Sequence, residues 1–282
     1  MDILHAVILG IVEGVTEYLP VSSTGHLTVV EKLLGYKLDD PGITAFTAIV
    51  QIGAIAAALL YFRKDIFRVA LAWLAGLFDK TKRTRDYWFG WAIIAGSMPI
   101  AVVGLLGKDI IETSLRSLWW VVAGLVVWSV VMWWADKYSA KLQKSHRRGE
   151  DKVTIKDTVI IGAVQCIALI PGVSRSGATI SAGLLRNIDR VAATRLSFFL
   201  GIPALVAAGG LQAVSHAKNI DATVGWTPTI VGIVVSFLVG YVSIAWLLKY
   251  VARHDFGWFI SYRLALAGVI AALILTGTIG AV

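Results

Sequence analysis

The sequence predicts an all-α integral membrane protein with six transmembrane helices and two re-entrant helical hairpins, arranged as two inverted-topology repeats. Three observations support this prediction: the composition, the spacing of long apolar segments, and a similarity between the two halves. Of the 282 residues, 57% are hydrophobic and only 16% are charged. Because a soluble domain has about 25% charged residues, this composition argues against a soluble globular fold.

Six apolar segments are long enough to cross a bilayer, which takes roughly 17–25 residues. They are Thr44–Phe62, Trp88–Gly107, Ser117–Ala135, Leu196–Val214, Pro228–Leu248 and Leu264–Val282. Many of the 11 tryptophans lie near the ends of these segments, where the indole ring favours the membrane interface. The shorter segment Asp65–Phe78 is amphipathic and has basic neighbours, which predicts a helix lying along the membrane surface.

The basic residues predict the orientation of these segments. Twenty of the 26 lysines and arginines lie in residues 63–85, 137–156, 186–195 and 249–263. The positive-inside rule places these four segments in the cytoplasm. The loops at 108–116 and 216–227, and both termini, are then expected on the outer side. Since the net charge of +8 follows the membrane loops, we expect no nucleic-acid partner.

Two further apolar segments, Ala6–Leu34 and Val159–Leu185, are each broken near the middle by proline, glycine and serine. Each must begin and end on the same side of the membrane if the six spans are to alternate in direction. We therefore predict two re-entrant hairpins that enter from opposite faces. Irregular backbone is tolerated at membrane depth where protein or a water-filled cavity satisfies its polar groups.

The two hairpins are similar to each other at an offset of 152 residues. The matched pairs are Gly10 with Gly162, Glu13 with Gln165, Ser22 with Ser174, and Gly25 with Gly177. This predicts a single membrane domain over residues 1–282, with repeats at about 1–136 and 153–282 and a cytoplasmic linker at about 137–152. Three spans follow each hairpin, and an odd number inverts the second repeat. Inverted repeats with broken helices place their site near the midplane, so one composite site is expected.

The first hairpin concentrates titratable and hydroxyl groups. Glu13 and Glu17 are four residues apart and share one helical face. Ser22 and Ser23 are natural caps for the next helix, whose first turn contains His26. An ionised group at the membrane centre costs roughly 2.5–3.5 kcal/mol. Any one of these groups could be a hydrogen-bonded core residue, but the cluster beside a break favours a functional site.

The second hairpin has the features of an anion site. Its loop is followed by a helix whose unpaired N–H groups and dipole favour an anion. Arg175 adds a planar fork of donors suited to phosphate, and Ser174, Ser176 and Thr179 add hydroxyls. The alternative is that Arg175 only neutralises a carboxylate of the first hairpin.

Together the hairpins offer the groups that phosphoryl transfer requires, where catalysis depends on positioning and charge stabilisation. A well-ligated zinc site is not expected, because His26 is the only nearby histidine. The single Cys166 excludes an internal disulfide and a cysteine-based metal cluster. Arg263, at the start of the last span, is expected to extend toward the cytoplasmic interface.

The motifs EGVTEYLPVSSTGH and PGVSRSGAT resemble the two signature motifs of the undecaprenyl-diphosphate phosphatases, also called bacitracin-resistance proteins. The similarity runs from the N-terminus to the segment FISYR. The resemblance implies a multi-pass enzyme of the bacterial inner membrane that hydrolyses undecaprenyl diphosphate to the monophosphate lipid carrier used in cell-wall synthesis. It also implies a divalent cation (Mg²⁺ or Ca²⁺), periplasmic termini, an active site open to the periplasm, and a homodimer. By motif position it assigns catalytic importance to Glu13, Glu17, Ser23, His26, Ser174, Arg175 and Thr179.

These expectations give a hypothesis for the mechanism. Ser23 would attack the terminal phosphorus, with His26 as its base or as an acid in later steps. Glu17 would orient His26 or hold the metal, which Glu13 would share, while Arg175 would neutralise charge on the phosphoryl group. The residues expected to bind phosphate are Ser22, Ser174, Arg175, Ser176 and Thr179.

Two alternatives remain open from the sequence. In the first, His26 or a metal-bound water is the attacking group, and Ser23 only donates a hydrogen bond to phosphate. In the second, the protein is a polyprenyl-phosphate flippase or a secondary transporter, because inverted repeats and broken helices are also a transporter design.

Overall fold

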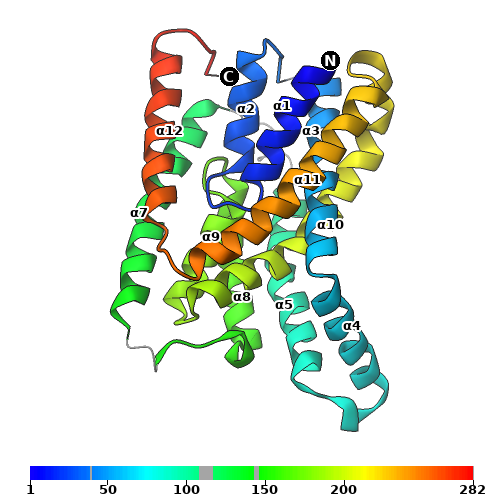
Figure 1. The fold of residues 1–282 in the computed structure, drawn as a ribbon, viewed down its shortest axis with the longest axis vertical. Helices are drawn as coiled ribbons and strands as arrows, with labels where there is room; N and C mark the ends of the chain where they lie inside the picture. The colour runs from blue at the N-terminus through cyan, green and yellow to red at the C-terminus, as the bar shows by residue number, and fades with distance from the viewer. Residues whose placement is uncertain (39, 108–116, 143–145, 282) are drawn as a thin grey trace.

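The computed structural model describes residues 1–38, 40–107, 117–142 and 146–281, except for the side chains at 208, 211–219 and 221–223. The described residues form helices and loops, with one isolated β-bridge between Arg148 and Ile188. The predicted outer loop at 108–116 lies outside the described residues. Figure 1 shows the two chain ends at the same end of the molecule and α4 at the opposite end.

Six helices in the described part of the chain are long and apolar enough to cross a membrane, which confirms the predicted number. They are α3 (Pro41–Tyr61), α5 (Arg85–Leu106), α7 (Leu118–Lys141), α10 (Arg190–Thr223), α11 (Trp226–Val251) and α12 (Gly257–Leu275). Their lengths and composition make the chain a multi-pass membrane protein.

Two boundaries differ from the sequence prediction. The outer loop predicted to begin at residue 216 is helical up to Thr223, because residues 211–224 contain neither glycine nor proline to end the helix. The last span was predicted to reach Val282, but α12 ends at Leu275. Gly277 follows with a φ of 71° and donates its N–H to the carbonyl of Ile274, a glycine arrangement that ends helices.

The two segments predicted as hairpins each consist of two helices separated by a loop. The first contains α1 (Ile3–Thr16) and α2 (Ser23–Leu33), joined by residues 17–22, which we call the first loop. The second contains α8 (Ile155–Gln165), the short 3-10 helix η4 (Cys166–Leu169) and α9 (Arg175–Leu185). Residues 170–174, before α9, are the second loop.

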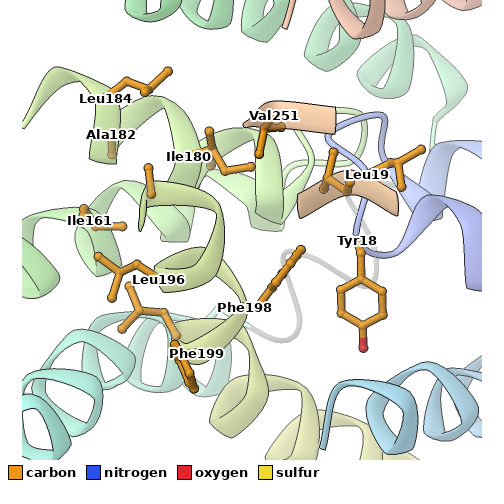
Figure 2. Packing of buried hydrophobic residues seen from close by; sticks show 14 of the residues in the cluster. Tyr18, Leu19, Ile161, Ile180, Ala182, Leu184, Leu196, Phe198, Phe199 and Val251 are labelled. Carbon is orange, nitrogen blue, oxygen red and sulfur yellow. The ribbon is translucent and has the colours of Figure 1, made fainter. Parts of the chain in front are cut away.

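Helix packing brings these short helices into the centre of the bundle. The helix α1 packs along α11, and α8 packs along α5, while α9 lies against α10 and α7. Figure 2 shows Tyr18 and Leu19 of the first loop in the same buried cluster as Ile180 of α9 and Phe198 of α10. The Tyr18 hydroxyl also donates to the Ala54 carbonyl, so the first loop is fixed by α3, α9 and α10.

The helix α4 (Arg63–Phe78) covers the predicted amphipathic segment Asp65–Phe78, and its position along the membrane surface stays a prediction. Asp65 of α4 forms salt bridges with Arg68 on the same helix and with Arg195 of α10. The second of these salt bridges attaches α4 to α10. Burial alone would raise the pKa of Asp65, but hydrogen bonds from Arg195 and Arg68 lower the pKa below its ordinary value. Asp65 is therefore ionised at neutral pH and holds α4 against the spans. The short 3-10 helices η1 (Lys80–Lys82) and η3 (Glu150–Lys152) complete the described elements.

Candidate active site

The two loops meet inside the bundle. The Arg175 guanidinium lies beside the Glu17 carboxylate, with a Nη2–Oε1 distance of 3.3 Å. The Ser176 hydroxyl donates to the Leu19 carbonyl at 3.0 Å. Residues about 157 positions apart in the chain thus form one cluster, as the hairpin similarity predicts.

The helices that follow the loops begin with the same backbone geometry. Ser22 precedes α2 with a φ of 76°, and Ser174 precedes α9 with a φ of 77°. Each serine hydroxyl accepts a hydrogen bond from the N–H of a glycine three residues later, Gly25 and Gly177 respectively. A non-glycine residue in this region costs about 1–3 kcal/mol and persists only where its surroundings enforce it. Since α2 begins at Ser23 and α9 at Arg175, these two residues occupy equivalent positions.

Glu17 connects Ser23 to Arg175. The partly exposed Ser23 hydroxyl donates to Glu17 Oε2 at 2.8 Å, while Arg175 Nη2 donates to Glu17 Oε1. Glu17 itself is buried. A carboxylate that accepts a hydrogen bond from a serine hydroxyl is placed to take its proton, and the guanidinium is suited to a phosphate oxyanion.

His26 has other partners than Ser23. Its Nδ1 lies 2.7 Å from the Ser22 carbonyl oxygen, and its Nε2 lies 2.7 Å from the Tyr262 hydroxyl of α12. The His26 and Tyr262 rings are stacked, with an interplanar angle of 6°. In the described structure, the hydrogen-bond partner of Ser23 is thus Glu17 rather than His26. Tyr262 was not predicted as a site residue, since no local pattern in the sequence connects residues 236 positions apart.

The hydroxyls expected to bind phosphate are already bonded within the protein. The buried side chains of Ser174 and Ser176 lie 3.1 Å apart. The Thr179 hydroxyl lies 2.6 Å from that of Ser197 on α10. Together with the Ser22 hydroxyl at the start of α2, these groups fix the loops and the helix starts. Ser197, which the sequence analysis missed, also accepts a hydrogen bond from Arg175 Nη1 on its carbonyl at 3.1 Å.

A glycine provides the space for the Arg175 guanidinium. A Cβ atom added to Gly201 of α10 would lie 1.6 Å from Arg175 Nη1. Any larger residue at position 201 would therefore displace the guanidinium. Gly201 and Ser197, one helical turn apart, position Arg175 from the same side.

The position of the Arg263 side chain differs from the position expected from the sequence. Its side chain is completely buried instead of extending toward the interface. The guanidinium donates to the carbonyls of Pro20 in the first loop, Gly172 in the second loop and Gly124 of α7. Because an arginine side chain presents five N–H donors, it can bond several carbonyls of irregular backbone that has no helical partner. Arg263 thus links the two loops through the carbonyls of Pro20 and Gly172.

The carboxylates of Glu13 and Glu17 provide only part of the ligands that a metal ion needs. In the described residues no group of three or more histidine, cysteine, aspartate or glutamate side chains is arranged to hold a metal ion. Glu13 is buried, and its Oε1 has no hydrogen-bond partner among the described residues. Mg²⁺ is commonly held by one or two carboxylates together with substrate phosphates. Glu13 and Glu17 fit a cation of this kind.

A third buried glutamate, Glu31 of α2, was not predicted from the sequence. It accepts a hydrogen bond from the Thr47 hydroxyl of α3. This bond ties α2 to α3 on the side of the first hairpin that faces away from α12.

Comparison with known proteins places this site in a family. The family described as "Bacitracin resistance protein BacA" matches residues 6–269. The chain is 59% identical over 282 residues to undecaprenyl-diphosphatase 3 of Frankia casuarinae, with all of both chains covered. It is 55% identical to undecaprenyl-diphosphatase of Cutibacterium acnes, again over all of both chains. It is 51% identical to undecaprenyl-diphosphatase 1 of Streptomyces coelicolor, over 99% of this chain and 98% of the other. The chain therefore belongs to the bacitracin resistance protein BacA family.

Proposed function

We propose that this chain is a membrane phosphatase that hydrolyses undecaprenyl diphosphate to undecaprenyl phosphate and inorganic phosphate. This reaction recycles the lipid carrier for cell-wall synthesis. The names of the full-length relatives support the substrate and the reaction. The observation that carries the proposal is the chain of contacts from Ser23 through Glu17 to Arg175.

In the proposed mechanism Ser23 is the nucleophile. Glu17 accepts the hydroxyl proton while Ser23 Oγ forms a bond to the terminal phosphorus. The bond between that phosphorus and the bridging oxygen breaks, and undecaprenyl phosphate leaves. Water then attacks the phosphoserine, inorganic phosphate leaves, and the serine oxygen recovers its proton from Glu17. Arg175 stabilises the charge on the phosphoryl oxygens in both steps.

The remaining predicted phosphate-binding residues act on the loop geometry. Ser22, Ser174, Ser176 and Thr179 use their hydroxyls to fix the starts of α2 and α9. A fixed start of α9 presents a helix N-terminus to the phosphate, which favours an anion. We therefore assign these side chains to positioning the phosphate-binding backbone.

Glu13 and Glu17 are the residues that would hold a divalent cation, Mg²⁺ or Ca²⁺. The buried Glu13 oxygen without a partner among the described residues supports this assignment. When bound, such an ion neutralises phosphate charge and orients the phosphate groups.

The proposed topology has two inverted repeats with re-entrant hairpins. The matching φ angles of Ser22 and Ser174, and the direct contacts between the loops, support it. The distribution of basic residues supports termini on the outer, periplasmic side. The family supports a bacterial plasma-membrane protein whose active site opens to that side. The homodimer stays a prediction.

A direct assay tests the proposed function. Purified protein in detergent, supplied with undecaprenyl diphosphate and Mg²⁺ or Ca²⁺, should release inorganic phosphate. Arg175→Ala should lower this rate about 100-fold or more, because one donor to a developing oxyanion is worth that much. Arg253→Ala, which removes an exposed arginine just after α11, is the matched control and should be unaffected. No release with either metal would contradict the phosphatase, and transfer of labelled lipid across vesicles would then test the transport alternative.

A second prediction concerns the space around Arg175. Gly201→Ala should leave the fold intact, because the added methyl group meets the movable end of a side chain. It should lower kcat about 100-fold, since a displacement of about 1 Å at a catalytic group has effects of that size. Phosphate release measures kcat, and thermal unfolding measures whether the fold is intact. The control is Gly268→Ala on α12, where an added Cβ meets nothing within 4 Å among the described atoms. Normal turnover in Gly201→Ala would show that the position of the guanidinium is unimportant.

A further inference from the structure

A tyrosine outside both sequence motifs contacts the catalytic cluster. The Tyr262 hydroxyl lies 2.7 Å from His26 Nε2, and the two rings stack with centroids 5.6 Å apart. The Tyr262 ring also stacks with that of Trp258, one turn earlier on α12, with centroids 5.8 Å apart and an interplanar angle of 7°. These stacked rings hold the hydroxyl at the imidazole edge.

The partners of His26 determine which of its nitrogens can exchange a proton. The Ser22 carbonyl can only accept a hydrogen bond, so the 2.7 Å contact requires a proton on Nδ1. In neutral His26, Nε2 is then the acceptor, and the Tyr262 hydroxyl is its donor. Proton exchange must therefore occur at Nε2, where Tyr262 is bound.

Two contacts fix the histidine ring on both of its nitrogens. His26 is 9% exposed, whereas Tyr262 is 37% exposed. With the Ser22 carbonyl at Nδ1 and the Tyr262 hydroxyl at Nε2, both the orientation and the tautomer of the imidazole are set.

We infer that Tyr262 is a positioning residue that orients His26 and keeps its Nε2 as the hydrogen-bond acceptor. The inference rests on the proposed phosphatase function and deepens it. Held in this tautomer, His26 serves as an acid or a base in the later steps of the reaction. Glu17 retains the role of proton acceptor for Ser23, with which it shares a hydrogen bond.

Tyr262→Phe is the test, because it removes only the hydroxyl and keeps the stacked ring. We expect kcat to fall about 100-fold, the lower range of a general acid–base contribution, with KM unchanged. We also expect the substitution to have no further effect in a His26→Gln background, because residues that act through one another are not additive. The matched control is Tyr36→Phe, which removes another 2.7 Å tyrosine–histidine contact, to His5, outside the loops. It should leave kcat unchanged.

A second measurement does not depend on turnover. In the ¹⁵N spectrum of histidine-labelled protein, Tyr262→Phe should shift the Nε2 resonance of His26, and Tyr36→Phe should shift only that of His5. An unchanged His26 resonance would overturn the hydrogen bond. Unchanged kcat in Tyr262→Phe, or full additivity with His26→Gln, would overturn the positioning role of Tyr262 while leaving the phosphatase intact. No phosphate release by the unmodified protein would instead overturn the proposed function and this role together.

Discussion

Ser23→Ala should lower the kcat for phosphate release by about 1,000-fold or more, because it removes the proposed nucleophile. Loss of a serine nucleophile has effects of this size or larger in other hydrolases. The structure favours this role, since Ser23 is partly exposed and donates to Glu17. Phosphate release from undecaprenyl diphosphate, followed from a single turnover to the steady state, measures the change.

The control for this substitution is Ser181→Ala. Ser181 is a buried serine of α9 whose hydroxyl donates to the Gly177 carbonyl within the helix. It should keep near-normal turnover. If Ser23→Ala also kept it, attack by His26 or by water would replace the serine mechanism. A labelled phosphoserine trapped in the unmodified protein would support Ser23 directly.

Arg263→Ala should destabilise the protein and abolish activity together. The Pro20 and Gly172 carbonyls of the two loops would lose their Arg263 donor. A buried acceptor left without a hydrogen bond costs about 1–3 kcal/mol, and the loss of the packed side chain adds to this cost. At roughly 2–4 °C per kcal/mol for a chain of 150–250 residues, Tm should fall by on the order of 10 °C.

Thermal unfolding in detergent and phosphate release measure the two effects of Arg263→Ala. Arg263→Lys separates charge from geometry, because one ammonium group cannot reach all the carbonyls that the planar guanidinium bonds. We expect intermediate stability and low activity for the lysine variant. An Arg263→Ala protein with unchanged Tm would show that the packing of Tyr18 and Leu19 against the surrounding helices holds the loops without Arg263.

The six spans and the breaks in both hairpins could be predicted because their causes are local. A span needs a run of apolar residues of sufficient length, and a break needs proline, glycine or serine within that run. Glu17, Ser23 and Arg175 were identified for a similar reason. They lie in two short segments whose polar groups are costly inside a membrane.

The partners of these residues could not be predicted, because each comes from a distant helix. Arg263 approaches Pro20 from a position 243 residues away, and Tyr262 approaches His26 from 236 residues away. Gly201 and Ser197 contact Arg175 from α10. Nothing in the sequence around Arg263 distinguishes an arginine at the interface from one that bonds two buried loops.

The sequence by itself determined the six segments that are long and apolar enough to cross a membrane, and the two polar breaks with the groups for phosphoryl transfer. Apolar length and the cost of buried charge act along the chain and are visible in it. Only the tertiary structure decided that Ser23 bonds to Glu17, that His26 bonds to Tyr262, and that Arg263 joins the loops. Hydrogen bonds act over about 3 Å, so the choice of partner depends on how the packed helices bring these side chains together.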